Sequence, residues 1–330
     1  MAYWLGMNTH KDDELPETLQ QAITYFSDAQ KAFELVGVMH WPDGVVRCHY
    51  CNSDNAGFLT TRRIWKCRDC RKQFSVKMGT IFEDSPLSLA KWLPAVWVIV
   101  NAKNGVSSCE LARSLGVTQK TAWFMLQRIR LAMQNGSLAK QTGQVEVDET
   151  FIGGKARNMH AGKRKVNGTG PVAMTAVQGL LERTTRKRGS QVRAMVIPDR
   201  QEATLQNNVR KYVLRGAEIH TDELSSYKGL DDTFTHQVIN HAVAYVRGHV
   251  HTNGLENFWS LLKRSIRGTY VSVEPFHLFR YLDEQTFRFN ERKDEDGDRG
   301  RFLTAMAGII GKRLTWKKLT GENESLPATA

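Results

Sequence analysis

Hydrophobic periodicity divides the chain into a front half with helical spacing and a back half with strand-like alternation. Apolar residues recur at helical spacing over residues 17–36 and again from 86 to about 136, with short strand-like runs between them. Alternating β-prone segments follow at 144–152, 172–181, 191–197, 217–221 and 237–246. Helical stretches are expected at 202–214 and from about Gly254 onward. The back half therefore predicts an α/β layer with a mixed sheet, and the whole chain is predicted to be multidomain α+β.

The net charge predicts the class of molecule that the protein binds. The 330 residues carry a formal net charge of +12 and a pI near 9.5, which points to an anionic partner, most often nucleic acid. Charge alone leaves open an ordinary soluble basic protein. Between residues 155 and 193, a single acid, Glu182, accompanies ten basic residues, which would draw a polyanion toward the nearby Asp148. These ten are Lys155, Arg157, Lys163, Arg164, Lys165, Arg183, Arg186, Lys187, Arg188 and Arg193.

No segment of the sequence reads as a membrane span or a secretory signal. The most apolar run, Trp92 to Val100, is too short to cross a bilayer. The N-terminus lacks the basic start and apolar stretch of a signal peptide. We therefore expect a cytoplasmic protein with no membrane partner.

Four cysteines form the strongest local motif. Two C-x2-C pairs, separated by fifteen residues, are made by Cys48, Cys51, Cys67 and Cys70. Four thiolates in this spacing close the tetrahedral shell of one structural zinc, and they predict a zinc ribbon. Two disulfides are the alternative, disfavoured by the cytosolic context, and a redox pair would need no duplicate. The remaining Cys109 lies on an apolar stripe with Ala112 and Leu115, which predicts a buried thiol.

The segment from Ser107 to Met133 predicts a helix, a tight turn at residues 115–117 and a second helix with Thr118 as N-cap. In the second helix five apolar residues would pack inward: Ala122, Met125, Leu126, Ile129 and Met133. Five others are then available for DNA: Gln119, Lys120, Thr121, Trp123 and Arg128. This helix-turn-helix interpretation competes with a helical hairpin used only for packing or dimerisation.

Three acids far apart in the sequence are candidates for a shared metal site. Asp148 follows Val145 and Val147 on a strand, where Asp148 and Glu149 must point to opposite faces, so only one can join such a site. Asp222 ends the short strand at 219–221.

The third acid, Glu256, is expected in the first turn of a helix capped by Thr252 or Asn253. Its helical stripe carries Lys263 and Arg267, and with Arg264 these cations are candidate DNA contacts. Carboxylates of this kind can hold two Mg²⁺ or Mn²⁺ ions about 3.5–4 Å apart for in-line displacement at phosphorus. Taken singly, each acid could equally be a turn former or a helix cap.

Taken together, the motifs resemble the DDE transposases of bacterial insertion sequences, in the ISXO-like branch with a zinc ribbon ahead of an integrase-type catalytic domain. The likeness runs from about Asp43 to Tyr270. Its segments are the double CxxC, the stretch from Trp92 through LARSLGVTQKTAWFMLQRIR, VEVDETFIGGK, HTDELSSY, Asn240-His241 and HTNGLENFWSLLKRSIRGTY.

The resemblance implies a ribonuclease H-like fold for residues 143–290 and a catalytic triad of Asp148, Asp222 and Glu256. It also implies two divalent cations and, as substrates, the terminal inverted repeats of an element and its target DNA. Water would free 3′-hydroxyls that then attack the target. Pairing two element ends calls for a homodimer or higher assembly, and the DNA-bound protein would lie at the bacterial nucleoid.

Five regions are expected from these signals. They are an N-terminal helical segment (1–42), the zinc ribbon (43–82), the helix-turn-helix region (83–136), the catalytic domain (143–290) and a linker with a C-terminal tail (291–330). An active transposase is the leading hypothesis. A non-catalytic DNA-binding regulator and a structure-specific nuclease without strand joining are the alternatives.

Overall fold

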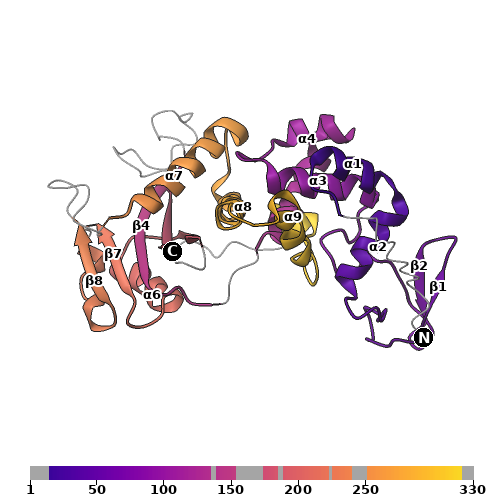
Figure 1. Cartoon of the computed structure of the whole chain (residues 1–330), viewed down its shortest axis with the longest axis horizontal. Coiled ribbons are helices and arrows are strands. Elements are labelled where there is room, and N and C mark those ends of the chain that lie inside the picture. The colour runs from indigo at the N-terminus through magenta and orange to yellow at the C-terminus, as the bar shows by residue number, and fades with distance from the viewer. Residues whose placement is uncertain are drawn as a thin grey trace. The chain divides into compact units, whose positions relative to one another are not determined.

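A computed structural model describes residues 15–134, 139–153, 174–184, 189–222, 225–239 and 251–321. The chain forms two compact units, one of residues 1–135 with 294–330 and the other of residues 136–293 (Figure 1).

Helices build most of the first unit. Its order is α1 (Leu19–Ser27), α2 (Ala29–His40), α3 (Leu89–Asn101), α4 (Ser108–Leu115), α5 (Gln119–Ala132), α9 (Gly297–Ala307) and α10 (Trp316–Thr320). The sequence predicted one helix over 17–36, whereas the structure has two. The carboxylate of Asp28 accepts the N–H groups of Gln30 and Lys31, so it caps α2 and ends the continuity with α1.

The cysteine-bearing segment is a three-stranded antiparallel sheet of β1 (Ala56–Leu59), β2 (Ile64–Cys67) and β3 (Gln73–Phe74). Trp65 of β2 is 2% exposed and anchors the sheet on α2. Its ring stacks on Phe33 of α2 and on Phe74 of β3. This aromatic cluster supplies the little core that so small a sheet can have.

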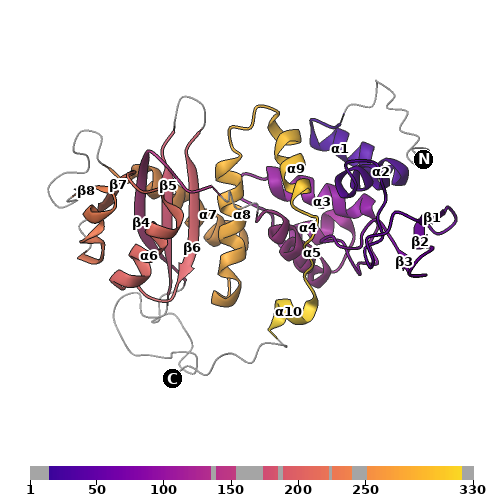
Figure 2. The ribbon, with the colours of Figure 1, turned by 90° about the horizontal axis from the view of Figure 1, so that it is seen from below.

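Residues 294–321 return to the first unit instead of forming the expected linker and tail. Helix α9 lies alongside α3 (Figures 1 and 2), where Phe302 packs against Trp97 and Phe26. Asn101 of α3 donates to the carbonyl of Asp298 and accepts from Nε of Arg301. The sequence did not predict this helix because a charged run precedes it. Its apolar residues Phe302, Ala305 and Met306 nevertheless have helical spacing and are buried.

Helices α4 and α5 are joined by the expected tight turn, with Gly116 in the left-handed conformation and Thr118 accepting the N–H of Thr121. Cys109 of α4 is exposed, which corrects the predicted buried thiol. The buried positions of this short helix are Leu111 and Ala112.

Arg128 of α5 is a structural residue in this unit. Its side chain is 5% exposed, and its guanidinium donates to the carbonyls of Leu314, Ile81 and Glu83 at 2.7–3.1 Å. Burial lowers its pKa. The expectation that Arg128 is available for DNA is therefore corrected, because carbonyls that are distant in the sequence take its donors.

A five-stranded mixed sheet forms the centre of the second unit, in the order β6-β5-β4-β7-β8. The strands are β4 (Gln144–Ile152), β5 (Thr175–Glu182), β6 (Gln191–Ile197), β7 (Glu218–Asp222) and β8 (Thr235–Ile239). The pairs β6-β5 and β5-β4 are antiparallel, and β4-β7 and β7-β8 are parallel. The mixed sheet predicted from the sequence is confirmed.

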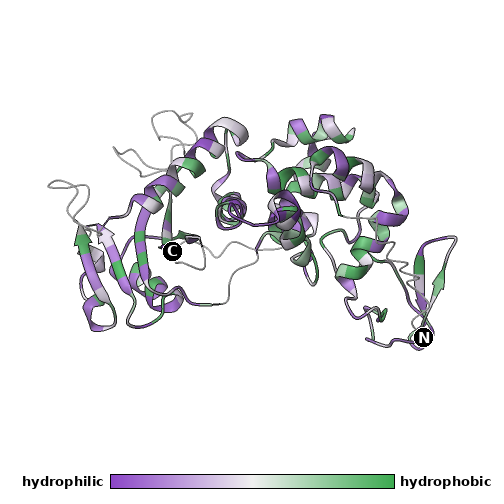
Figure 3. Cartoon of the chain, in the orientation of Figure 1, coloured by the Kyte–Doolittle hydropathy of each residue, from purple (hydrophilic) through white to green (hydrophobic). Residues whose placement is uncertain are grey.

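Helices cover both faces of this sheet. On one face α6 (Glu202–Tyr212) buries Leu205 and Val209 against Val145 and Val147 of β4. On the other face α7 (Asn253–Ser265) and α8 (Leu278–Asn290) bury an apolar core with Val177 of β5. Helix α7 has the hydrophobic and hydrophilic sectors of a helix that lies on a sheet (Figure 3). Among the described helices, none is long and apolar enough to cross a bilayer.

Replacing Arg128 by methionine is expected to destabilise the first unit by about 2–4 kcal/mol, because three buried carbonyls lose their charged donor. Thermal or urea unfolding measures this. Lys103→Met, exposed in the turn after α3, is the control and should leave stability nearly unchanged. Unchanged stability of Arg128→Met together with weaker duplex binding would contradict the structural role.

Candidate active site and zinc-binding cluster

Two acids of β4 bind α7 directly. Glu146 is 1% exposed, and its Oε2 accepts the N–H of Leu255 at 3.0 Å, in the first turn of the helix. It thereby supplies the N-terminal cap that the side chain of Thr252 does not provide. The other oxygen of Glu146 accepts from Nε of Arg183 at 2.8 Å, and the same guanidinium donates to the carbonyl of His251. The start of α7 is therefore held by a buried, paired carboxylate.

Asp148, two residues further along β4, meets α7 one turn later. Its Oδ2 accepts the indole N–H of Trp259 at 2.9 Å, and its Oδ1 accepts the N–H of Glu149 at 2.8 Å. The pKa of Asp148 is raised to about 6, mainly by burial and to a smaller extent by the charges of Asp222 and Glu256, while the two hydrogen bonds oppose the shift. The three predicted acids therefore share one electrostatic environment.

Glu149 is a further acid in this environment. Burial and the charges of Asp148 and Asp222 raise its pKa to about 8, and Arg200 on its side of the sheet partly offsets them. Within the described part of the chain, its Oε1 is buried and has no hydrogen-bond partner. Strand alternation places Asp148 toward α7 and Glu149 away from it, as expected, yet both line the same groove.

The other two predicted acids come from the expected elements. Asp222 is the last residue of β7, and Glu256 is exposed in the first turn of α7. Among the described residues, only the four cysteines bring three or more candidate ligand atoms within 4.8 Å of one another, so the three carboxylates are less tightly gathered than that.

A groove of 570 Å³ runs from the acids along α7. Asp148, Glu149 and Glu256 line its acidic part. The remaining lining includes three cations: Lys263 and Arg264 in the last turn of α7, and Arg267 in the π-helical segment Ile266–Tyr270 that continues it. All three line the same groove, so the groove joins carboxylates to a basic track.

The four cysteines converge as predicted. The Sγ atoms of Cys48 and Cys70 are 3.6 Å apart, as are those of Cys51 and Cys67. A tetrahedral zinc with Zn–S bonds of 2.3 Å requires S···S separations of about 3.8 Å. The donor set and its spacing therefore fit a structural zinc ion.

The other predicted DNA-contacting residues lie on the first two turns of α5. Gln119 and Lys120 are exposed, and Thr121 and Trp123 are partly buried. Trp316 of α10 packs against this region, with Lys120 over its ring and Trp123 against its edge. Beyond these turns α5 is a core helix, since Gln127, Arg128 and Arg130 are buried.

Several predicted features lie outside the described residues. They are Asn240 and His241 and eight of the ten basic residues between 155 and 193. The two that are described are Arg183, directly after β5, and Arg193, on β6. Arg183 donates a hydrogen bond to Glu146.

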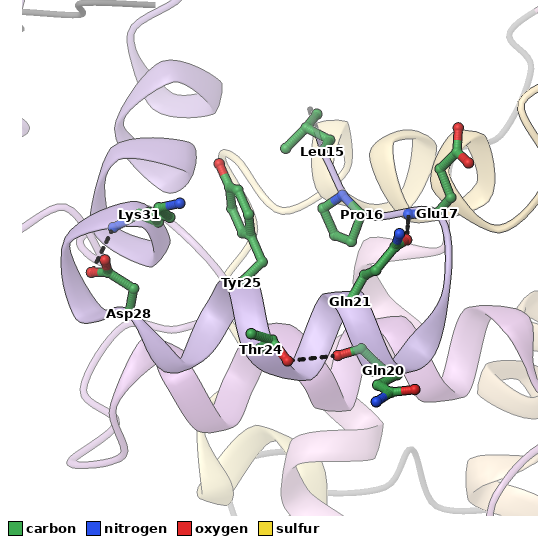
Figure 4. A pocket seen from close by; sticks show the side chains of 9 residues that line it. All are labelled: Leu15, Pro16, Glu17, Gln20, Gln21, Thr24, Tyr25, Asp28 and Lys31. Atoms are coloured by element: carbon green, nitrogen blue, oxygen red, sulfur yellow. Dashed lines mark hydrogen bonds between the residues drawn. The ribbon is translucent and has the colours of Figure 1, made fainter. Parts of the chain in front are cut away.

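Another pocket, of 580 Å³, lies between α1 and α2 in the first unit (Figure 4). Its polar groups serve the helix ends: Gln21 accepts the N–H of Glu17, and Asp28 accepts that of Lys31. These contacts account for its polarity without a catalytic group.

Comparison with known protein families matches two regions of the chain, and these regions contain the two candidate sites. The ISXO2-like transposase domain matches residues 140–290, and the transposase zinc-ribbon domain matches residues 27–73. An uncharacterized transposase-like protein of Haemophilus influenzae is 35% identical over 100 residues, which are 30% of this chain and 80% of that protein. The chain belongs to the ISXO2-like transposase family. A second relative, an uncharacterized protein in transposable element ISH50 of Halobacterium salinarum, is 27% identical over 264 residues, 73% of this chain and 84% of that protein.

The two family matches cover the two candidate sites of this transposase-family chain. The first contains Asp148, Asp222 and Glu256, and the second contains the four cysteines. Sequence reasoning missed Glu146 and Trp259, and it placed Arg183 in the basic patch without its bond to Glu146. The alternation in QVEVDETFI already placed Glu146 on the face of Asp148, and Trp259 lies three residues after Glu256, on the same side of α7.

Removing zinc is expected to unfold the ribbon, because its small aromatic core depends on the four-thiolate clamp. The purified protein should contain about one zinc ion per chain by elemental analysis. A chelator, or Cys67→Ser, should lower the melting temperature and expose Trp65. Cys109→Ser is the control, since this exposed thiol lies apart from the cluster. Full stability of the metal-free protein would contradict a structural zinc.

The raised pKa values predict that the metal-free protein loses stability as pH rises. A carboxyl whose pKa is higher in the folded than in the unfolded state binds more protons when folded, so its folded form is favoured at low pH. For Asp148 and Glu149 this stability disappears as pH rises from about 4 to about 8.

Asp148→Asn should therefore stabilise the metal-free protein by about 1–3 kcal/mol at about pH 8, and by less at about pH 5. Thermal unfolding at the two pH values measures the difference. Asp232→Asn is the control, because hydrogen bonding lowers the pKa of that exposed carboxyl and no gain is expected. Equal stability of Asp148→Asn and wild type at both pH values would contradict the burial of a charge-repelling carboxylate.

Proposed function

We propose that the chain is a DNA transposase that cleaves the ends of an insertion sequence and joins the freed 3′-hydroxyls to target DNA. The observation that carries this proposal is the groove in the family domain, where Asp148 and Glu256 meet cations from the end of α7 and the π-helical segment after it. A polyanionic strand needs the cations, and phosphodiester chemistry needs the carboxylates.

The proposed metal ligands are Asp148, Asp222 and Glu256. The charges of Asp222 and Glu256 already raise the pKa of Asp148, as expected for carboxylates that divalent cations would stabilise. Bound Mg²⁺ or Mn²⁺ would activate the attacking oxygen and stabilise the leaving one. The donors are hard oxygens, which suits these cations.

The protein itself supplies position and charge. Lys263, Arg264 and Arg267 bind the phosphates of the strand that enters the groove. The bonds from Glu146 and Asp148 to α7 hold Glu256 at a constant place relative to β4. The scissile phosphate is thus held beside the carboxylates in a defined orientation.

The proposed catalytic domain has a ribonuclease H-like fold. The five-stranded mixed sheet, with helices on both faces and acids from β4, β7 and α7, supports this. Each acid comes from a different element, as a site built by the tertiary fold requires.

We propose that the first unit recognises the ends of the element. Gln119, Lys120, Thr121 and Trp123, on the first turns of α5, are the proposed DNA contacts, since the start of a recognition helix is the part that reaches base edges. The zinc-stabilised ribbon adds further contacts. Two ends must be paired, so the active assembly is a homodimer or larger.

A non-catalytic DNA-binding regulator is the rival function. Such a protein would need the first unit alone. The unfavourable gathering of acids around Asp148 is the observation against it, because a regulator gains nothing from carboxylates that repel one another.

The decisive experiment is a strand-transfer assay with Mg²⁺ and a duplex that carries the cognate terminal repeat. Wild type should nick and join strands. Asp148→Asn should lose at least about 10³-fold in rate, equivalent to several kcal/mol of transition-state stabilisation. Asp231→Asn, an exposed carboxylate outside the groove, should retain full rate. Retained strand transfer in Asp148→Asn would overturn the assignment, and duplex binding without any nicking by wild type would favour the regulator.

A further inference from the structure

Trp259 makes a contact that the proposed chemistry does not itself explain. This tryptophan is 4% exposed, and its indole N–H donates to Oδ2 of Asp148 at 2.9 Å. A buried indole N–H requires an acceptor, and here the acceptor is the proposed metal ligand itself. The question is whether the contact only satisfies the indole or also positions the carboxylate.

The neighbouring strand, β5, leaves room for the indole ring of Trp259. Gly179 of β5 lies directly opposite Asp148 of β4 in the antiparallel register, so a side chain there would project onto the same face of the sheet. A Cβ atom at residue 179 would lie 2.6 Å from Cζ2 and 2.8 Å from Cη2 of Trp259, and 2.8 Å from Cδ2 of Leu255. The leucine methyl group is the far end of a flexible side chain, whereas the two indole atoms belong to a rigid, buried ring.

Gly179 is therefore a requirement for the Trp259 contact. Backbone conformation gives no reason for glycine here, since Gly179 does not have a positive φ. A glycine in the middle of a strand also weakens the strand. In return, glycine at residue 179 allows the indole of Trp259 to approach the carboxylate of Asp148 on the next strand.

The contact also joins two of the proposed ligands. Glu256 lies three residues before Trp259 and so on the same side of α7. The bond to Asp148 fixes the register of the helix against the strand at this point. One indole therefore sets the orientation of Asp148 and its distance from Glu256.

Asp148 retains oxygen lone pairs for a cation. Its Oδ1 accepts from the backbone of Glu149 and its Oδ2 from Trp259, so each oxygen has one donor. A carboxylate oxygen has two lone-pair sites, which leaves one on each atom. Hydrogen bonds of this kind orient a metal-ligating carboxylate without blocking it.

From these contacts we propose that Trp259 is a positioning residue for Asp148, and that Gly179 is the residue that makes its position possible. This inference rests on the proposed function, because it assigns Asp148 the role of a cation ligand. Trp259 lines the groove, and its proposed effect on the cation is exerted through the carboxylate that accepts its N–H.

The first test measures cation binding without DNA. Trp259→Phe should weaken Mn²⁺ binding about 10-fold to 100-fold in calorimetry, the range typical when a partner of a metal ligand is removed. Strand transfer should then fall mainly in kcat at saturating DNA, with KM for DNA little changed. Leu282→Ala, in α8 and in the same apolar core, is the control for lost packing and should leave the Mn²⁺ affinity near wild type.

The second test is a double-mutant cycle. Gly179→Ala should reduce Mn²⁺ affinity in the wild-type background by displacing the indole. In the Trp259→Phe background the same change should have a smaller effect, since the smaller ring leaves room for the methyl group and only the flexible end of Leu255 must move. Coupling of this kind is expected only for residues that act through one contact.

A spectroscopic signature separates failure of this inference from failure of the proposed function. Among the indole N–H signals of the eight tryptophans, the one lost in Trp259→Phe should shift in Asp148→Asn even without metal. In wild type it should shift again on addition of Mg²⁺.

The outcomes are distinct. If wild type binds no divalent cation and joins no DNA while the indole signal still responds to Asp148→Asn, the proposed function fails and the contact is structural. If wild type is active and Trp259→Phe matches it in Mn²⁺ affinity and kcat, the positioning role is overturned. Additive effects in the cycle would overturn the role of Gly179.

Discussion

The docking of α7 onto β4 is the interaction on which the candidate site depends. Two acids on one face of the strand, Glu146 and Asp148, bind the helix at Leu255 and Trp259. Two residues of a strand advance about 7 Å and four residues of a helix about 6 Å, so the two bonds match along both elements. This match places Glu256, which lies between the two bonded helix residues, beside the strand that carries Asp148.

The docking also shows how stability and function are divided within the site. Glu146 is buried and paired with Arg183, and Gly254 leaves space for it, since a Cβ there would lie 2.8 Å from Oε2. At this end of the interface the carboxylate of Glu146 has its hydrogen-bond partners, and it holds the start of α7. Asp148 and Glu149 are partly buried near like charges, which raises the pKa of each. Such an arrangement is unfavourable in the metal-free protein and is typical of groups kept for chemistry.

Local patterns predicted what local physics determines. The bounds of β4 and β6, the cap at Thr118 and the cysteine cluster all follow from residues close together in the sequence. The break between α1 and α2 was missed, because the apolar spacing continues across Asp28 while its side chain caps the second helix.

Contacts between distant residues could not be predicted in this way. Arg128 looked available for DNA on a helical wheel, but a carbonyl 186 residues later accepts one of its donors. The indole of Trp259 reaches Asp148, 111 residues earlier, only because β5 presents Gly179 opposite that aspartate. The sequence predicted the candidate acids, and the structure adds the residues that contact Asp148 and the start of α7.

Anomalous diffraction from crystals containing Mn²⁺ tests the central claim most directly. The account predicts anomalous density in the groove within coordination distance, about 2.0–2.3 Å, of oxygens from Asp148 and at least one of Asp222 and Glu256. Trp259 should still donate to Asp148 in that crystal. Fully occupied Mn²⁺ sites elsewhere, with none at Asp148, would contradict the account.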